Sequence, residues 1–340
     1  MKSILSNRSF RFMFTGMVAG IIGDSLLLIT LAIWVKDLTG SDGAAGLTMF
    51  FLGAPYLMAP LAGWLVDRLP FKPFLVVANL LNILVLLPLA FVSGVADVWM
   101  IYLVAFMLGV GGVVDTPAVN GLLKLLLPDD QLVDANGLSQ TVRQGMRLLG
   151  PIIGAGIYMT AGGFAVAILD AVCFVIAAAM FALVAVEQPR REPSGLAWRA
   201  EISAGFRFLA KEKALLRAVS GMFIAAWAIG AIESVGFAIA DKGLGQPSEF
   251  ISVIVTAMGV GGIIGGVLAA RIVRRFGELG SEGAGLLCLA TAFLLWSIPS
   301  IPVVLGSAAL AGFALPVVIV ADNTLIQRRS PKELIGRVSA

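Results

Sequence analysis

Residues 63–72 read Gly-Trp-Leu-Val-Asp-Arg-Leu-Pro-Phe-Lys, a short charged segment between two long apolar runs. The pattern returns 203 positions later in residues 266–275, with glycine, leucine and arginine at matched positions. A second match at the same offset pairs Ala118, Asn120, Leu122 and Pro128 with Ala321, Asn323, Leu325 and Pro331. Two separate coincidences at one offset predict a duplicated unit.

The composition indicates a membrane protein. Hydrophobic residues make up 59% of the 340 residues and charged residues 13%, about half the charge of a soluble domain. The mean hydropathy is +0.97, and apolar runs of roughly 20 residues, each long enough to cross a bilayer as a helix, recur throughout. The alternation of a transmembrane β-barrel is missing. The predicted fold class is therefore an all-α membrane protein.

We expect about ten transmembrane helices, arranged as two related bundles. The expected spans are 11–36, 45–67, 74–93, 98–124, 137–160 and 163–186, then 214–240, 250–272, 281–299 and 302–327. Residues 1–186 form a six-helix bundle, 187–213 a cytoplasmic linker, and 214–340 a second bundle of four helices. Since the repeat of residue 186 falls near 389, we expect a chain truncated before its last two helices, with a complete ten-helix protein as the alternative.

The basic residues set the expected orientation. Of 24 lysines and arginines, only Lys36 and Lys242 fall in segments assigned to the outside. The positive-inside rule then makes the N-terminus and the linker cytoplasmic, in a multi-pass protein of the cell (inner) membrane. The net charge of +3 follows this topology, so no nucleic-acid partner is expected.

Several kinds of chemistry lack their usual residues. There is no histidine, and Cys173 and Cys288 lie inside apolar runs, so neither a metal site nor a disulfide is predicted. No nucleophile–base pair stands out, so an enzyme is not expected. The glycine-rich residues 259–266 lie inside a predicted membrane helix, where close helix packing explains them better than a nucleotide site. No cofactor is expected.

The charged segment and several further motifs resemble the major facilitator superfamily, in which residues 63–72 match the loop signature between the second and third helices. The resemblance extends to the drug-efflux branch that holds macrolide exporters and the enterobactin exporter. Its marks are Gly23-Asp24, residues 38–41, 115–118, 128–132 and 135–137, Arg147, and residues 150–154, 169–171 and 336–338. The chain departs from the loop signature at Pro70 and Phe71, and from its second copy at Ala270.

This resemblance implies a fold of two pseudo-symmetric helix bundles that open alternately to each side of the membrane. It implies a secondary active exporter of amphipathic small molecules, working as a monomer and driven by protons. Gly150, Pro151 and Gly154 resemble an antiporter motif of the fifth helix. Gly63, Asp67, Arg68 and Lys72 are implied to gate the cycle by bridging the halves, and the alternative is a charge pair that only fixes orientation.

Charged residues inside the membrane are the candidate site, because each costs at least about 2.5–3.5 kcal/mol on insertion scales. Asp24 lies near mid-membrane, and carboxylates that lose water bind protons more readily. It is a candidate for proton coupling or substrate contact, or for a static ion pair with Arg147. Glu233 is a candidate for the same roles, or a solvated helix end.

Three other acidic residues have narrower expected roles. Asp115 is expected to pair with Arg143 and brace the inner gate, with substrate contact as the alternative. Asp170 is expected to serve packing, and Asp322, close to Arg328 and Arg329, is expected to be structural.

Two other functions stay open at this point. An importer of a nutrient or lipid has the same architecture, and only the helix-5 motif speaks against it. A non-transporting membrane scaffold or an inactive fragment is the alternative from another class, because the second bundle is expected to be incomplete.

The topology predicts the outcome of cysteine labelling in intact cells. The substitution Ala200→Cys places a thiol in the predicted cytoplasmic linker, so a membrane-impermeant maleimide should label it only after the cells are opened. Val95→Cys, in a predicted outer loop, is the matched control that should be labelled from outside. Labelling of position 200 in intact cells would contradict the topology.

Overall fold

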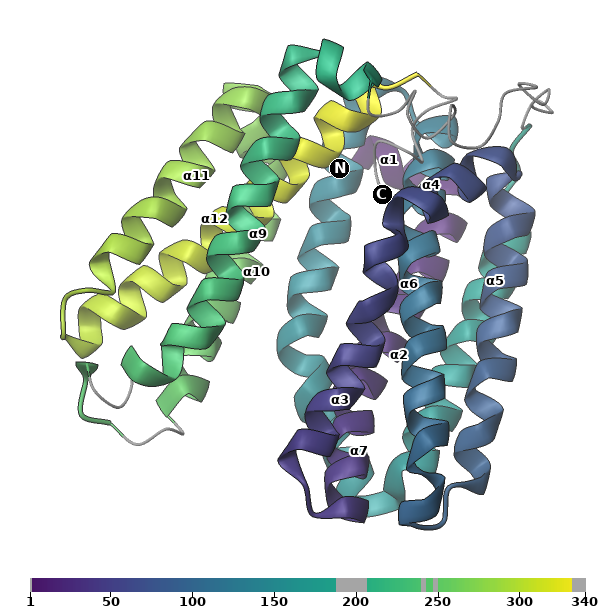
Figure 1. Ribbon diagram of the computed structural model, residues 1–340. Helices are drawn as coiled ribbons and strands as arrows, with labels where there is room; N and C mark the ends of the chain where they lie inside the picture. Colours follow the sequence, from purple (N-terminus) through teal and green to yellow (C-terminus); the bar gives the residue numbers. More distant parts are fainter. Residues whose placement is uncertain (1, 188–206, 240–242, 247–249, 332–340) are drawn as a thin grey trace. The chain divides into compact units, whose positions relative to one another are not determined.

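All regular structure in the described part of the chain is helical (Figure 1). The computed structural model describes residues 2–187, 207–239, 243–246 and 250–331. Among them, eight helical stretches are long and apolar enough to cross a membrane. The predicted linker lies mostly outside the described residues, as do Lys242 and residues 336–338.

The helices form two compact units, which we call the first and the second unit. The first holds residues up to Pro128 and the chain from Leu149 to the end of α7. Its earlier helices are α1 (Lys2–Ser6), α2 (Arg8–Thr39), α3 (Asp42–Gly53), α4 (Ala59–Arg68), α5 (Phe71–Leu86) and α6 (Val98–Leu126). The second holds residues 129–148 together with α9 (Lys213–Ala238), α10 (Ile251–Phe276), α11 (Glu278–Leu295) and α12 (Ile301–Arg329). The division into bundles at 186 and 213 stays a prediction.

Helix α7 (Asp129–Ala182) contributes to both units. It covers the two predicted spans 137–160 and 163–186, which are separated by a kink where Gly162 has a φ of 80°. Only glycine adopts this backbone conformation without strain. The helix begins at Asp129, before the expected start of the membrane span at about residue 137. Asp129 and Asp130 occupy its first turn, where negative charge stabilises a helix.

Short polar residues and prolines set the other helix boundaries. The side chain of Asn7 caps α2 by accepting from the Phe10 amide, and Gly40, with a φ of 68°, ends it. Ser41 then caps α3. The predicted single span 45–67 is α3, the 3₁₀ segment η1 (Ala54–Met58) and α4, because Pro55 and Pro60 interrupt the helical hydrogen bonds.

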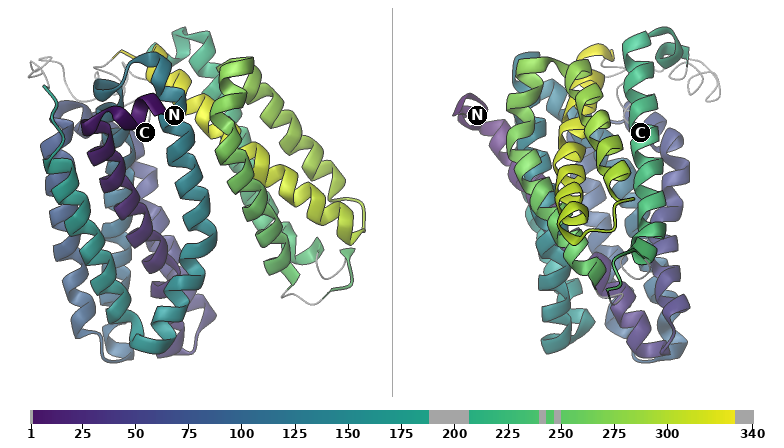
Figure 2. Two further views of the ribbon diagram at one scale, coloured as in Figure 1. Left: turned by 180° about the vertical axis from the view of Figure 1, so that it is seen from behind. Right: turned by 90° about the vertical axis from the view of Figure 1, so that its left-hand side faces the viewer.

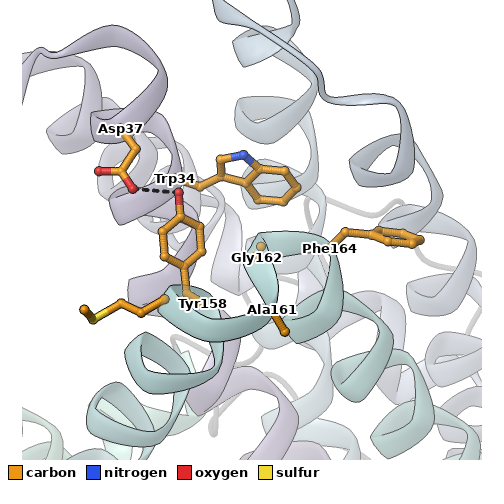
Figure 3. A pocket seen from close by; sticks show the side chains of 8 residues that line it. Trp34, Asp37, Tyr158, Ala161, Gly162 and Phe164 are labelled. Carbon is orange, nitrogen blue, oxygen red and sulfur yellow. Dashed lines mark hydrogen bonds between the residues drawn. The ribbon is translucent and has the colours of Figure 1, made fainter.

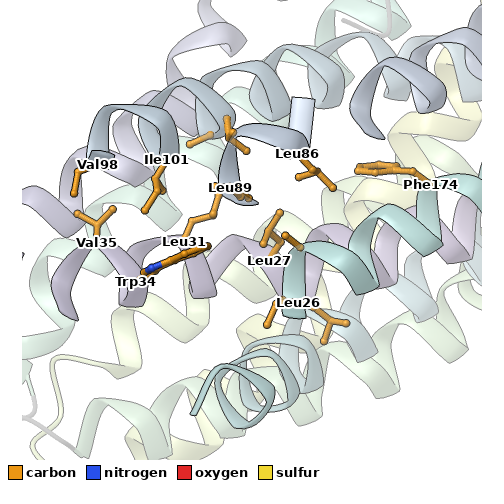
Figure 4. Close-up of a cluster of buried hydrophobic side chains, with 14 residues drawn as sticks. Leu26, Leu27, Leu31, Trp34, Val35, Leu86, Leu89, Val98, Ile101 and Phe174 are labelled. Atoms are coloured by element: carbon orange, nitrogen blue, oxygen red, sulfur yellow. The ribbon is translucent and has the colours of Figure 1, made fainter. Parts of the chain in front are cut away.

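The core of the first unit is a cluster of apolar side chains from four helices (Figure 4). Leu27, Leu31 and Val35 of α2 lie there with Ile101 of α6 and Phe174 of α7, each at most 3% exposed. Lipid tails are as apolar as these side chains, so close packing rather than escape from water holds membrane helices together.

The duplicated unit predicted from the charged segments is visible in the helix bounds. Shifted by 203 positions, the bounds of α6 become those of α12. Ala118 and Ala321, at matched positions, are 0% and 1% exposed. In the second unit α10, α11 and α12 run beside one another (Figure 2).

The glycine-rich segment of α10 serves close packing, as predicted. A Cβ added at Gly261 or Gly265 would overlap the backbone carbonyl oxygens of Ala309 and Phe313 in α12. One added at Gly312 of α12 would overlap the Met258 carbonyl oxygen of α10. The two backbones therefore meet directly, which is how small residues join membrane helices.

This contact predicts that Gly265→Ala destabilises the protein. The methyl group would push α10 and α12 apart, at a cost of about 1–3 kcal/mol for overpacking. Thermal unfolding of the purified chain in detergent measures the loss. Gly306→Ala is the matched control, because a Cβ there meets no atom within 4 Å; it should unfold at the wild-type temperature or above. Equal stability of both variants would contradict the packing.

Candidate functional site

A cavity of about 300 Å³ lies inside the first unit, between α2, the region of α3 and η1, and α6. Its walls are apolar apart from Asp24 of α2 and Tyr56 of η1. Asp24, the predicted coupling residue, is thus the charged side chain of an otherwise apolar cavity. Gly109 and Gly112 of α6 leave room for this wall, because a Cβ at either would meet η1 or its neighbours within 3.0 Å.

The antiporter-like motif holds α7 against α2 at the level of Asp24. A Cβ added at Gly150 would lie 2.6 Å from the Ser25 Cβ, and one at Gly154 would overlap the Leu26 carbonyl oxygen. Pro151 between them lacks the amide hydrogen that would close a helical bond, but it lies within the helix. The structure therefore brings Gly150 and Gly154 to the residues that follow Asp24.

The later part of α7 contacts the same turn of α2 from a second side. A Cβ added at Gly23 would overlap Oδ1 of Asp170 and lie 3.0 Å from the Cys173 Cβ. Asp170 is 0% exposed, and neither of its carboxylate oxygens accepts a hydrogen bond from a described residue. The sequence did not predict that Asp170 lies against Gly23, the residue next to Asp24.

The other candidate coupling residues are placed less fully. Arg147 is exposed in α7, one turn before Gly150. Glu233 lies in α9, but its side chain is outside what the structure describes. The pairing of Asp24 with Arg147 and the role of Glu233 stay predictions.

The charged segment around residues 63–72 is more buried than a loop. Gly63 and Asp67 lie in α4, and the Asp67 side chain is 1% exposed. The Arg68 guanidinium stacks over the Trp64 ring, 4.2 Å from its centre. Lys72 is half-buried in the first turn of α5. In the second copy the matching buried position is Ala270, against which Gly137 of α7 packs.

The expected gate pair of Asp115 and Arg143 stays a prediction. Asp115 is half-buried in α6, two residues before Pro117. Arg143 is exposed in the early part of α7.

A buried polar network, unforeseen from the sequence, ties the start of α7 to α12 within the second unit. The Asn136 amide donates to the Thr324 hydroxyl at 3.0 Å and to Gln327 Oε1 at 2.7 Å. Nearby, Asp134 forms an ion pair with Arg274 of α10. Residues 135–137 are among the positions at which the sequence resembles the drug-efflux branch, which drew attention to Asn136. The spacing of residues along the chain does not, however, predict a hydrogen-bond partner 188 residues away.

The second unit also buries two carboxylates. Glu282 of α11 and Asp322 of α12 are 5% and 3% exposed, and both Asp322 oxygens lack a hydrogen-bond partner among the described residues. The arginines expected near Asp322 have other partners. Arg328 binds Glu278 and the Asp129 carbonyl oxygen, and Arg329 lies 3.6 Å from Glu212.

A second hollow, of about 510 Å³, lies at the kink of α7 (Figure 3). The Tyr158 hydroxyl donates to Asp37 of α2 at 2.8 Å, and Trp34 packs against Gly163. These contacts anchor the kink to the end of α2. Among the described residues, no cluster of three or more acidic or cysteine side chains is arranged to hold a metal ion.

The profile of the Major Facilitator Superfamily matches residues 13–340. The chain belongs to this superfamily.

Relatives and solved structures agree with the superfamily fold. The chain is 27% identical over 180 residues to macrolide efflux protein A of Streptococcus pyogenes, a match covering 52% of this chain and 44% of that protein. It is 25% identical to the multidrug efflux pump Tap of Mycolicibacterium fortuitum, over 96% of this chain and 82% of Tap. The human organic anion transporter MFSD10 has the same fold, with a TM-score of 0.80, 18% identity, and coverage of 98% and 88%.

Membership of the Major Facilitator Superfamily confirms the predicted all-helical membrane fold, and its members are transporters rather than enzymes. The match to macrolide efflux protein A spans less than half of that relative's length.

The polar network predicts a measurable coupling between Asn136 and Gln327. Asn136→Ala, Gln327→Ala and the double variant form a cycle, and thermal unfolding in detergent gives each loss of stability. Interhelical hydrogen bonds in membrane proteins contribute about 0.6 kcal/mol on average, up to about 1.7, so we expect a coupling in that range. Ser139→Ala combined with Gln327→Ala is the control, because Ser139 bonds within its own helix. Strictly additive losses for Asn136 and Gln327 would contradict the network.

Proposed function

We propose that this protein is a secondary active exporter that moves amphipathic small molecules out of the cell in exchange for protons. The observation that carries the proposal is Asp24, a carboxylate in an apolar cavity of the first unit. An apolar wall with one charged group suits a molecule that has an apolar body and a polar or cationic end.

The cavity size bears on how such a molecule binds. About 300 Å³ is the lower end of the range for ligand pockets. It takes the apolar part of a drug-sized molecule rather than the whole of a large one. The Leu27, Leu31 and Leu52 side chains in its wall supply the contact surface for this part.

Proton coupling follows from which groups can carry a proton. The chain has no histidine, so a carboxylate is the side chain that can gain and lose a proton within the membrane near neutral pH. In the proposed cycle Asp24 is protonated from outside and releases its proton inside, and substrate leaves in the opposite direction. Arg147 and Glu233 are proposed to assist by pairing with charges of the site.

The glycine contacts suggest how a change in the charge of Asp24 affects the packing of other helices. Gly150 and Gly154 let α7 touch the backbone of α2 within two residues of Asp24. A change in hydration at Asp24 therefore alters the packing of α7. We propose that α7 relays this change toward the gating residues Gly63, Asp67, Arg68, Lys72, Asp115 and Arg143.

The direction of transport rests on the Gly150–Gly154 motif and on relatives named as efflux proteins. An importer has the same fold, so direction is measured rather than read from architecture. Uptake of a fluorescent cationic dye into inside-out vesicles indicates export, and uptake into right-side-out vesicles indicates import.

The proposal predicts that Asp24→Asn abolishes proton-driven export. Asparagine has the size of aspartate but cannot release a proton, so dye accumulation in inside-out vesicles energised by a proton gradient should fall to the level obtained with a proton ionophore. Asp37→Asn is the matched control on the same helix, since asparagine keeps an oxygen that accepts from Tyr158. Wild-type accumulation in the Asp24→Asn vesicles, with equal protein in the membrane, would remove Asp24 from the mechanism.

A further inference from the structure

Asp170 carries a buried carboxyl group that no neighbouring hydrogen-bond donor stabilises among the described residues. It lies in the later part of α7, fully buried, and no described residue donates a hydrogen bond to either oxygen. Burying a polar group without a partner costs free energy, and burying an unpaired charge costs far more. A role in packing alone would be served better by an apolar side chain of the same size.

The contact with α2 places Asp170 beside Asp24. Its Oδ1 lies against Gly23, where any side chain would displace it, and Asp24 is the next residue. Asp24 is also the charged group that interacts electrostatically with Asp170. Asp24 is exposed and lines the cavity, whereas Asp170 is fully buried and is not part of the cavity wall.

Other titratable groups in the described part of the chain lie on the elements around the two carboxylates. Cys173, one turn further along α7, is the other titratable side chain packed against Gly23. On the cavity side, η1 carries Tyr56 in the cavity wall, and α6 carries Asp115, one turn beyond Gly112. The early part of α7 carries Arg147, one turn before Gly150, and α5 carries a charge only at Lys72, in its first turn.

Two carboxylates that interact in a medium of low dielectric do not both ionise, and their protons leave in two steps that belong to the pair. We propose that Asp24 and Asp170 act as one proton-binding pair, in which Asp24 exchanges the proton with the cavity and Asp170 holds it away from water. This inference rests on the proposed proton coupling and adds a second residue to it.

The transfer step is balanced within the pair. With both groups protonated, the Asp24 O–H bond breaks and its proton passes to a water molecule in the cavity, so that the pair changes from neutral to a single negative charge. The remaining proton passes from the Asp170 oxygen to the Asp24 oxygen or back, forming one O–H bond as the other breaks. Uptake of one proton by the ionised oxygen returns the pair to neutrality.

The test combines infrared spectroscopy with transport, using the full chain. Difference spectra between low and high pH report the C=O stretch of protonated carboxyl groups in the purified protein, with no substrate present. Subtracting the spectra of the double variant Asp24→Asn with Asp170→Asn removes the signals of other buried carboxyl groups such as Glu282 and Asp322. The wild type should then show two coupled titration steps, and Asp170→Asn or Asp24→Asn alone should each leave one. Asp37→Asn is the control that should keep both steps.

Asparagine at position 170 also separates a proton carrier from a neutral packing residue. It has the shape of the protonated carboxyl group, so a residue that stays permanently neutral would tolerate the change. We expect Asp170→Asn vesicles to lose proton-driven dye accumulation while keeping dye exchange at equal concentrations on both sides, which needs no net proton movement.

The outcomes distinguish this inference from the proposed function. If Asp170→Asn keeps both titration steps and wild-type accumulation, the pair is overturned and export through Asp24 alone stands. If the wild type accumulates no dye against a proton gradient, the proposed function fails; the infrared steps then still decide whether the two carboxyl groups bind protons as a pair.

Discussion

The close approach of α7 to one turn of α2 is the contact on which the candidate site depends. Gly150 and Gly154 remove the side chains that would separate α7 from Ser25 and Leu26, and Gly23 does the same on α2 opposite Asp170. Membrane helices gain little free energy from escaping water, so their association depends on close packing. Glycine allows this packing because it has no side chain to keep the two backbones apart. Asp24 therefore lies on a turn held from two directions by one helix, with its carboxylate facing the cavity between α2 and α6.

Helix α7 carries this constraint into the second unit. Its later part packs beside Asp24, and its first part is joined to α10 and α12 by the Asp134–Arg274 ion pair and the Asn136–Gln327 hydrogen bond. The contacts of Gly150 and Gly154 and the polar network at Asn136 thus lie on the same helical stretch of α7, before the kink at Gly162.

The sequence was sufficient for properties that depend on length and repetition. Apolar runs give the spans, and the offset between Gly63 and Gly266 gives the duplication, which the bounds of α6 and α12 confirm. It was insufficient where polar residues are buried. Residues 129–136 are too polar to resemble a membrane span, but they begin α7 because Asp134 and Asn136 find partners on distant helices. Asp67 lies in a charged segment, yet its side chain is buried. The sequence does not predict this burial, since the neighbours of a residue along the chain do not determine which other helices cover it.

The same limit explains why the sequence indicated Asp24 but not its neighbour. Hydropathy marks any carboxylate inside an apolar run, and it marks Asp24 and Asp170 equally. Which of them share a site depends on which helix faces meet, and Gly23 decides that by leaving space for Asp170. A glycine beside a membrane carboxylate is thus informative in two ways, since it predicts close packing and allows a second polar group to approach the first. In the second unit Gly221 leaves the same space for Glu282, which lies near Asp322, so each unit buries one carboxylate against a glycine.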